Sequence, residues 1–336
     1  MNLLSFITKI FHFLPEEISH YLALKGLKMI HSVGLLKLLI GNKTLDKKVS
    51  NNPNDLRLLE NKLGIAAGLD KNGEYIDCLT ALGIGFLEVG TVTPVKQDGN
   101  PKPRLFRNRK DKSLLNRLGF NNNGVEALVE NLKRRNSNIT LGVSIGKNFS
   151  TPNESAYKDY LFCLEKVYQH SNYIAINISS PNTKDLRKLS DVDILEDLLL
   201  KIKEKQNQLS QTFKYVPIFV KISPDENEEA LKHICKCIIK CNIDGIISSN
   251  TTINHNDING HGGLSGLPLK DEATKKLIFI KKLVGNKLPI IASGGVMSAS
   301  DYKEKIDAGA DLVQVYTGFI FEGPKLIQDI LDLNTS

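Results

Sequence analysis

Hydrophobic and polar positions alternate in long blocks after about residue 60. Short apolar runs end in Gly, Ser, Thr, Asn or Lys, and most are followed by a longer stretch with helical spacing. The apolar runs are Gly64–Gly68, Phe86–Gly90, Leu141–Ile145, Tyr173–Ile178, Val216–Ile222, Gly245–Ser249, Pro289–Ala292 and Leu312–Tyr316. The helical stretches between them include Glu154–Tyr168, Ile194–Leu209, Glu226–Cys241 and Glu272–Val284.

This order predicts an α/β fold. Strands that are buried on both faces are continuous apolar runs, and strands that alternate with helices pair in parallel. Eight repeats are the number that closes a (β/α)8 TIM barrel, which we place at residues 61–336. A doubly wound open sheet is the alternative, but Gly83, Gly85 and Gly90 lack the G-x-G-x-x-G spacing of its nucleotide loop.

The first 45 residues form a separate apolar block. Pro15 divides it, and Glu16 and Glu17 suit the first turn of a second helix. Apolar positions with a fringe of lysines are typical of a helix pair in a membrane interface, and equally of an amphipathic pair packed on the main domain. The pattern leaves both open. Residues 46–60 are polar around Asn51 to Pro53 and are interpreted as a linker.

Composition narrows the class of protein. The 336 residues include 41% hydrophobic and 24% charged positions, which excludes a disordered chain and a small disulfide scaffold. The net charge of +7 is compatible with anionic small molecules, an anionic membrane or nucleic acid. An odd number of cysteines indicates reduced thiols, and Cys235, Cys237 and Cys241 are interpreted as helix residues rather than zinc ligands.

The residues that end the eight runs carry the candidate chemistry, because a barrel gathers its strand ends on one face. They are rich in amides, hydroxyls and lysines, and Asp70 is the main acid. Hydrolysis by paired carboxylates and a divalent metal site are therefore not expected. Gly294, Gly295, Thr317 and Gly318 follow the last two runs, where barrels commonly bind phosphate. The set favours a phosphorylated planar cofactor with a carboxylated substrate above it.

Several of these segments resemble the dihydroorotate dehydrogenases. Ala66–Gly73 and Glu88–Pro94 resemble the first flavin loops of the family, and Pro103–Arg107 with Asn116–Asn122 resembles its substrate-contacting insert. Asn177–Thr183 is similar to the catalytic loop. The resemblance continues through Ser249–Thr252, Gly262–Gly266, Ser293–Val296 and Tyr316–Gly318. The motifs occur in the family's order from about Leu63 to the C-terminus, so the series is far more specific than any one motif.

Two features resemble the quinone-dependent class 2 branch. Ser180 stands at the position of the catalytic base, where soluble class 1 enzymes carry Cys. The apolar residues 1–45 resemble the class 2 helical domain, which lies on the membrane and opens a quinone tunnel to the flavin. Since no apolar run of about 18 residues and no transit peptide is present, the resemblance implies a bacterial form. Such a protein is expected to be a monomer, peripheral on the cytoplasmic side of the cell membrane.

The resemblance implies a reaction. It is the oxidation of (S)-dihydroorotate to orotate, the fourth step of pyrimidine biosynthesis, with one FMN per chain. A hydride leaves C6 for FMN N5, Ser180 removes the C5 proton, and a quinone reoxidises the flavin. A serine hydroxyl is a poor base, so a relay through Thr183 and water is our hypothesis.

Site residues follow from the matched positions. The lysines Lys71 and Lys221 would stabilise the reduced flavin, amides would recognise the dihydropyrimidine, and glycines would hold the phosphate. Substrate-binding residues are expected to be Lys71, Asn116, Arg117, Leu118, Gly119, Phe120, Asn177, Asn182, Asn250 and Thr251. Cofactor-binding residues are expected to be Ala67, Gly68, Leu69, Asp70, Lys71, Thr91, Ser144, Asn177, Lys221, Ser249, Gly266, Gly295, Tyr316 and Thr317. Ser144 and Ser249 depart from the Asn and Thr that class 2 relatives usually carry.

Two other functions compete with this interpretation. One is a flavin barrel that modifies RNA, such as a tRNA-dihydrouridine synthase, which the positive charge would suit. Those enzymes use a Cys acid and a basic RNA-binding extension, whereas this chain has Ser180 and an apolar extension, so no nucleic acid partner is expected. The other is a non-enzymatic membrane-surface scaffold, which would not explain the polar residues at the strand ends.

Overall fold

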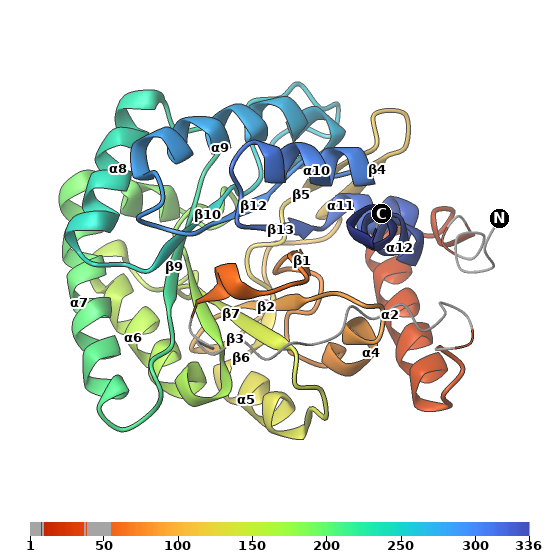
Figure 1. The fold of residues 1–336 in the computed structure, drawn as a ribbon, viewed down its shortest axis with the longest axis horizontal. Helices are drawn as coiled ribbons and strands as arrows, with labels where there is room; N and C mark the ends of the chain where they lie inside the picture. The colour runs from red at the N-terminus through yellow and green to blue at the C-terminus, as the bar shows by residue number, and fades with distance from the viewer. Residues whose placement is uncertain (1–7, 9, 37, 39–54, 336) are drawn as a thin grey trace.

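The barrel predicted from the sequence is present in the computed structural model, which describes residues 8, 10–36, 38 and 55–335 (Figure 1). Eight strands close in the order β1-β13-β12-β10-β9-β8-β7-β2, and every neighbouring pair is parallel. They are β1 (Leu63–Ile65), β2 (Phe86–Val92), β7 (Thr140–Ile145), β8 (Tyr173–Asn177), β9 (Ile218–Ile222), β10 (Gly245–Ser248), β12 (Ile290–Ser293) and β13 (Leu312–Val315). All eight overlap the predicted apolar runs, although β1, β2, β7 and β12 extend beyond them by one or two residues, and the (β/α)8 fold is confirmed.

Helices surround the strands in an outer layer (Figure 1). They are α4 (Ile76–Thr80), α5 (Val125–Arg134), α6 (Ala156–Val167), α7 (Val192–Ser210), α8 (Glu228–Lys240), α9 (Lys270–Val284), α10 (Ala299–Asp307), α11 (Thr317–Glu322) and α12 (Pro324–Thr335). Short 3-10 turns join them at η2 (Asn153–Ser155), η3 (Tyr168–His170), η4 (Leu186–Ser190) and η5 (Leu267–Leu269). The four helices predicted from spacing are confirmed, and the five cysteines are buried free thiols.

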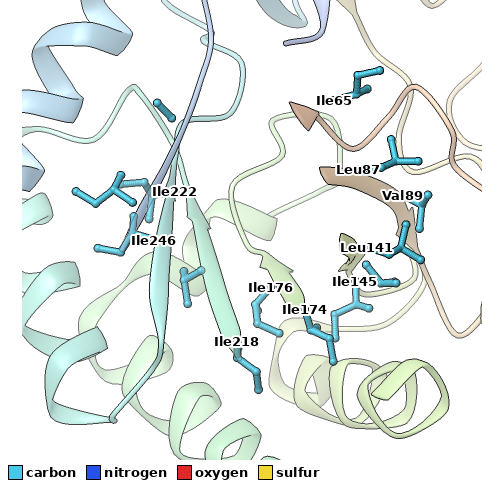
Figure 2. Packing of buried hydrophobic residues seen from close by; sticks show 14 of the residues in the cluster. Ile65, Leu87, Val89, Leu141, Ile145, Ile174, Ile176, Ile218, Ile222 and Ile246 are labelled. Atoms are coloured by element: carbon cyan, nitrogen blue, oxygen red, sulfur yellow. The ribbon is translucent and has the colours of Figure 1, made fainter. Parts of the chain in front are cut away.

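The main hydrophobic core lies between the strands and this helical layer. Figure 2 shows Ile174, Ile176 and Ile218, which are fully buried residues of this cluster on β8 and β9. A second cluster fills the barrel itself, and its large side chains are Phe86, Tyr173 and Phe219. Burial of this much apolar surface is the dominant favourable contribution to folding.

Each large ring inside the barrel lies against a glycine of the neighbouring strand. Gly64 pairs with Phe86, and Gly142 pairs with Tyr173. A Cβ atom at Gly142 would lie 2.1 Å from the Tyr173 ring, and one at Gly64 would lie 2.5 Å from the Phe86 ring. The glycines therefore make room for the rings, which close the amino-terminal end of the barrel and leave the carboxyl-terminal end for the site.

The chain enters the barrel at this closed end. Residues 46–54 of the predicted linker lie outside the described residues. The 3-10 turn η1 (Leu56–Leu58) follows, and Leu56 is buried in the cluster that contains Phe86 and Tyr173. The end of the predicted linker is thus packed against the barrel.

Two small sheets, which the sequence pattern does not predict, stand over the carboxyl-terminal end. One has the order β11-β5-β4, and its strands are β4 (Leu105–Asn108), β5 (Ser113–Asn116) and β11 (Gly263–Gly266). The other pairs β3 (Val95–Gln97) with β6 (Asn122–Gly124). Both are antiparallel. They bring the insert after β2 and the segment after β10 together above the barrel.

The helix predicted after Pro15 is α2 (Glu16–Ser32), which lies beside α4 at the edge of the barrel (Figure 1). Glu17 binds the guanidinium of Arg104 at 3.0 Å, and Lys28 donates to the carbonyl of Glu74. Residues 1–7, 9, 37 and 39–45 of the predicted apolar block lie outside the described residues. Within the described part of the chain, no helix is long and apolar enough to cross a membrane.

Candidate active site

One cavity opens at the carboxyl-terminal end of the barrel and gathers most of the predicted site. It encloses about 1040 Å³, including its open mouth, which is the size of a site for a cofactor-sized ligand. The predicted residues that line it are Ala67, Gly68, Lys71, Thr91, Asn116, Leu118, Gly119, Phe120, Asn177, Ser180, Asn182, Lys221, Ser249, Asn250, Thr251, Gly266, Gly295, Tyr316 and Thr317. Segments far apart in the sequence thus meet at one place.

Four predicted residues do not line this cavity: Leu69, Asp70, Ser144 and Arg117. The Asp70 carboxylate accepts hydrogen bonds from the amides of Glu74 and Tyr75 at 2.9 and 2.8 Å, so it fixes the loop after β1. Burial raises the pKa of Asp70 to about 6. The Arg117 guanidinium donates to the carbonyls of Asn259 and His261 and so holds the loop before β11.

Ser144 does not line the cavity but binds Thr91, which does. Its hydroxyl lies 2.9 Å from Oγ1 of Thr91, and Thr91 Oγ1 also accepts from Nδ2 of Asn177 at 2.8 Å. Because Thr91 and Asn177 both line the cavity, the serine at position 144 supports two cavity residues through one hydroxyl.

Amide side chains form a connected network around the cavity. Asn250 donates from Nδ2 to Oδ1 of Asn177 at 3.2 Å and to the Ser179 hydroxyl at 3.0 Å. Asn182 donates to Oδ1 of Asn116 at 2.8 Å, and Asn116 donates to the carbonyl of Gly263 at 3.0 Å. These bonds fix the orientation of each amide before any ligand arrives, which lowers the cost of binding a polar ring.

Ser180 lies in the loop that follows β8 and is only 6% exposed. Its Oγ accepts one long hydrogen bond, 3.3 Å from the amide of Asn182, and it lines the cavity. The Thr183 hydroxyl is buried and has no hydrogen-bond partner in the part of the chain that the structure describes. The Ser180 hydroxyl therefore keeps hydrogen-bonding capacity for a ligand in this cavity. Thr183 does not line this cavity but a neighbouring one, where its hydroxyl can bind water.

Two lysines bring positive charge to the cavity. Lys71 donates to Oδ1 of Asn121 at 2.5 Å, and burial, together with nearby Arg104, lowers the pKa of Lys71 to about 7. Lys221 lies 3.7 Å from the carboxylate of Glu88.

Glu88 is fully buried inside the barrel. It accepts hydrogen bonds from Tyr173 at 3.0 Å and from Gln314 at 2.8 Å. Glu88 and Gln314 are not among the predicted site residues, although Gln314 lines the cavity. A glutamate and a glutamine inside otherwise apolar strands are the sequence signal that identifies them.

The opposite wall of the cavity is built from backbone. Gly266 and Gly295 have φ angles of 97° and 75°, which favour glycine. A Cβ atom at Gly295 would lie 2.2 Å from Cα of Lys270, so no side chain fits there. Thr317 donates to the Ser265 hydroxyl at 2.8 Å beside these glycines. A glycine cradle with hydroxyls, two lysines and a ring of amides fits the phosphate, the polar edge and the flat ring of FMN.

Further lining residues are not among the substrate- and cofactor-binding residues expected above, although Gly294 and Gly318 were already candidates for binding phosphate. They are Ala66, Leu105, Leu114, Ser265, Leu269, Ser293, Gly294, Val296, Gln314 and Gly318. Leu105 and Leu114 belong to the small sheet above the barrel, whose pairing with β11 cannot be inferred from local sequence. Within the described ranges, no group of three or more His, Cys, Asp or Glu residues is arranged to hold a metal ion.

A second cavity, which is strongly apolar, lies between α2 and the barrel. It encloses about 1140 Å³ with its open mouth, and its walls include Phe11, Ala23, Leu24, Leu27 and Ile30 on one side. The other side includes Leu69, Leu105, Leu114, Phe319 and Ile320. Leu105 and Leu114 line both cavities, so the apolar cavity adjoins the site at the barrel end.

Comparisons with known proteins agree with this architecture. Residues 54–334 match the family model for dihydroorotate dehydrogenase. Curated relatives named dihydroorotate dehydrogenase (quinone) include one from Neisseria meningitidis, 46% identical over 95% of this chain and 95% of its own length. Another, from Saccharophagus degradans, is 44% identical over 98% of both chains. A third, from Pectobacterium atrosepticum, is 53% identical over 81% of this chain and 83% of its own.

A solved structure has a similar fold over nearly the whole chain. The crystal structure of DHODH from Eimeria tenella in complex with ferulenol superposes with a TM-score of 0.81 at 33% identity, covering 94% of this chain and 90% of that one. The similarity therefore includes the helical N-terminal part as well as the barrel. By its sequence, its family model and its fold, the chain belongs to the quinone-dependent dihydroorotate dehydrogenase family.

Proposed function

We propose that this protein oxidises (S)-dihydroorotate to orotate and passes the electrons to a quinone through FMN bound at the carboxyl-terminal end of the barrel. One observation carries the proposal: a single cavity brings together Ser180, two lysines, four asparagines and a glycine cradle. The family supports the same reaction, because relatives that align with nearly the whole length of this chain are named dihydroorotate dehydrogenase (quinone).

The cofactor would be held by both walls of the cavity. Gly266, Gly295 and Thr317 would hold its phosphate, with Tyr316 beside it, and Lys221 would face the polar edge of the ring. Bound FMN would supply the hydride acceptor for C6 of the substrate and the electron carrier for the quinone. The Glu88 carboxylate would keep Lys221 oriented, because the two charged groups lie 3.7 Å apart.

The substrate would lie above the flavin, between the amide network and Phe120. Asn116, Asn177, Asn182 and Asn250 would bind its ring amides and carboxylate, since each amide can both donate and accept. Lys71 would add positive charge for the carboxylate. Ser180 would take the C5 proton, and the buried Thr183 hydroxyl would relay it through water.

The apolar cavity beside α2 would admit the quinone. It reaches Leu105 and Leu114, which also line the flavin site. On the outer surface of α2, Ile18, Tyr21 and Met29 are more than half exposed. Such a face favours peripheral association with the cytoplasmic side of the cell membrane, close to the quinone pool.

The test is anaerobic mixing of the purified protein with (S)-dihydroorotate while the visible flavin band is followed. Rapid bleaching that a quinone reverses, and that fumarate or NAD does not, is the expected result. A yellow protein that stays yellow would exclude dihydroorotate as the substrate and favour the RNA-modifying alternative. A colourless protein that cannot take up FMN would contradict the whole site assignment.

The low pKa of Lys71, about 7, predicts a pH dependence of ligand binding. A carboxylate binds the protonated ammonium, so above pH 7 binding must be accompanied by proton uptake. We expect the dissociation constant of orotate to rise by up to about tenfold per pH unit between pH 7.5 and 9. Isothermal titration in two buffers of different ionisation enthalpy measures both the affinity and the proton uptake.

Lys71→Gln is the matched control for this pH dependence. It should bind orotate weakly and with the same affinity at both ends of the pH range. An affinity of the wild-type protein that stays constant from pH 6 to 9 would exclude loss of the Lys71 proton in this range. An unchanged affinity in Lys71→Gln would exclude Lys71 as the group that binds the carboxylate.

A further inference from the structure

Arg187 connects loops that follow different strands of the barrel. It lies in η4, after the loop that carries Ser180. Its Nε donates to the carbonyl of Ser179 at 3.2 Å, and one terminal nitrogen donates to the carbonyl of Thr251 at 3.0 Å. The other terminal nitrogen binds the carboxylate of Asp225 at 2.7 Å. The three acceptors follow β8, β10 and β9 respectively.

Asp225 is itself held on several sides. One carboxylate oxygen accepts from the Thr252 hydroxyl, and the other accepts from the amide of Ile253 at 2.9 Å as well as from Arg187. Its own amide donates to the Ser223 hydroxyl at 3.1 Å. The carboxylate therefore joins the loop after β9 to the loop after β10 without help from Arg187, and Arg187 adds the loop after β8.

The hydrogen bonds of Arg187 lie next to the residues that line the cavity. The Ser179 carbonyl belongs to the peptide unit that links Ser179 to Ser180, and Thr251 lines the cavity. A guanidinium that holds both carbonyls fixes the direction of the Ser180 backbone relative to Thr251. Neither Arg187 nor Asp225 lines the cavity, so neither touches a ligand bound there.

The ion pair is too enclosed to be an ordinary surface salt bridge. The side chains of Arg187 and Asp225 are 21% and 11% exposed. Exposed pairs typically contribute little, whereas partly buried, charge-assisted hydrogen bonds in a fixed fork are stronger and more directional. A lysine ammonium donates from one nitrogen and cannot reproduce the three separate donor positions of the guanidinium.

We propose that Arg187, oriented by Asp225, is a positioning residue that holds the Ser179–Ser180 peptide unit against the Thr251 loop. It thereby keeps the Ser180 hydroxyl aimed at the substrate carbon from which the proton leaves. The catalytic part of this inference rests on the proposed function. The mechanical part, that Arg187 restrains both loops, does not depend on it.

The experiment compares Arg187→Lys, Arg187→Ala and Asp225→Asn with the wild-type holoenzyme. The matched control is Arg135→Ala, because Arg135 is also half-buried and donates to one backbone carbonyl, that of His170 at 2.9 Å. Arg135 lies between α5 and β7, and therefore at the amino-terminal end of the barrel. Amide hydrogen exchange, FMN content, orotate affinity and the single-turnover rate of flavin reduction are measured for each protein.

We expect Arg187→Lys and Arg187→Ala to slow flavin reduction by about 10- to 100-fold, the effect of misplacing a reacting group by about 1 Å. FMN content and orotate affinity should stay within about threefold of the wild-type values. Amide exchange should rise at residues 179–182 and 251–253 and remain unchanged in the barrel strands. Asp225→Asn should show the same pattern, and Arg135→Ala should show none of it.

Two results would overturn the inference. One is a rate of flavin reduction in Arg187→Ala within twofold of the wild-type rate. The other is exchange that rises throughout the barrel, as it would for a purely structural residue. If the wild-type flavin is not reduced by dihydroorotate, the proposed function fails. The exchange pattern then still decides whether Arg187 restrains the two loops.

Discussion

Ser180→Ala is expected to slow reduction of the bound flavin by dihydroorotate by about 10²- to 10⁴-fold, the usual contribution of a general base. The reason is the position of the hydroxyl, which lines the cavity and, among the described residues, is bound only by the Asn182 amide at 3.3 Å. The change removes one oxygen atom and leaves the amide network intact. FMN and orotate should therefore bind with nearly unchanged affinity. Anaerobic stopped-flow mixing measures the rate directly.

Ser179→Ala provides the matched control for this prediction. Ser179 is the preceding residue and is fully buried, but its hydroxyl accepts a hydrogen bond from Asn250. Its removal should weaken substrate binding by less than about tenfold and leave the rate at saturating substrate nearly unchanged. Thr183→Val, which replaces the proposed relay hydroxyl by a methyl group, should give an intermediate rate. Near-normal flavin reduction in Ser180→Ala would show that another group is the base.

The barrel could be predicted because each of its strands is buried on both faces. Such strands must be apolar throughout, and the sequence pattern is therefore visible without any tertiary information. The positions at which the strands end were predicted less accurately. The first run was predicted as Gly64–Gly68, but β1 ends at Ile65. Gly68 instead donates to the carbonyl of Gly90, because the chain turns across the top of the barrel there.

The two small sheets could not be predicted in the same way. Their strands have only three or four residues, and β4 is half-buried along its length. Asn116 pairs with Gly263, far away in the sequence, so no local signal specifies the partner. Loop positions near the site were predictable, but side-chain directions were not. Asp70 and Arg117 lie in the expected loops, and their side chains bind backbone groups away from the cavity.

The buried polar residues inside the barrel carry a signal that is visible in the sequence. Glu88 and Gln314 interrupt apolar strands, and burial of an isolated carboxylate is costly unless it is paired and hydrogen-bonded. The structure supplies Lys221, Tyr173 and Gln314 as partners. An acidic residue in the middle of a fully buried strand therefore predicts a cation nearby, here the lysine at the end of β9.

Filling the apolar cavity beside α2 is expected to slow the second half of the reaction, reoxidation of the flavin by quinone, and to spare the first, reduction of the flavin by dihydroorotate. Ala23 is half-buried and lines this cavity from α2, together with Leu24, Leu27 and Ile30. A phenyl ring at position 23 would occupy space that is open in the structure, so the cost of overpacking should be at or below the usual 1–3 kcal/mol or so. In Ala23→Phe we expect quinone-dependent turnover to fall by about tenfold or more. Reduction of the flavin by dihydroorotate should remain within about twofold of the wild-type rate.

This difference between the two half-reactions tests the route of the quinone. Leu105 and Leu114 line both cavities, and a quinone that reaches the flavin through the apolar cavity must pass α2. Leu22→Phe is the control, because Leu22 is 42% exposed on the same helix and does not line the cavity. A short-chain quinone in detergent removes any effect of membrane binding from the comparison. Equal quinone turnover in Ala23→Phe and Leu22→Phe would exclude the cavity beside α2 as the entry route, because only the first variant narrows it.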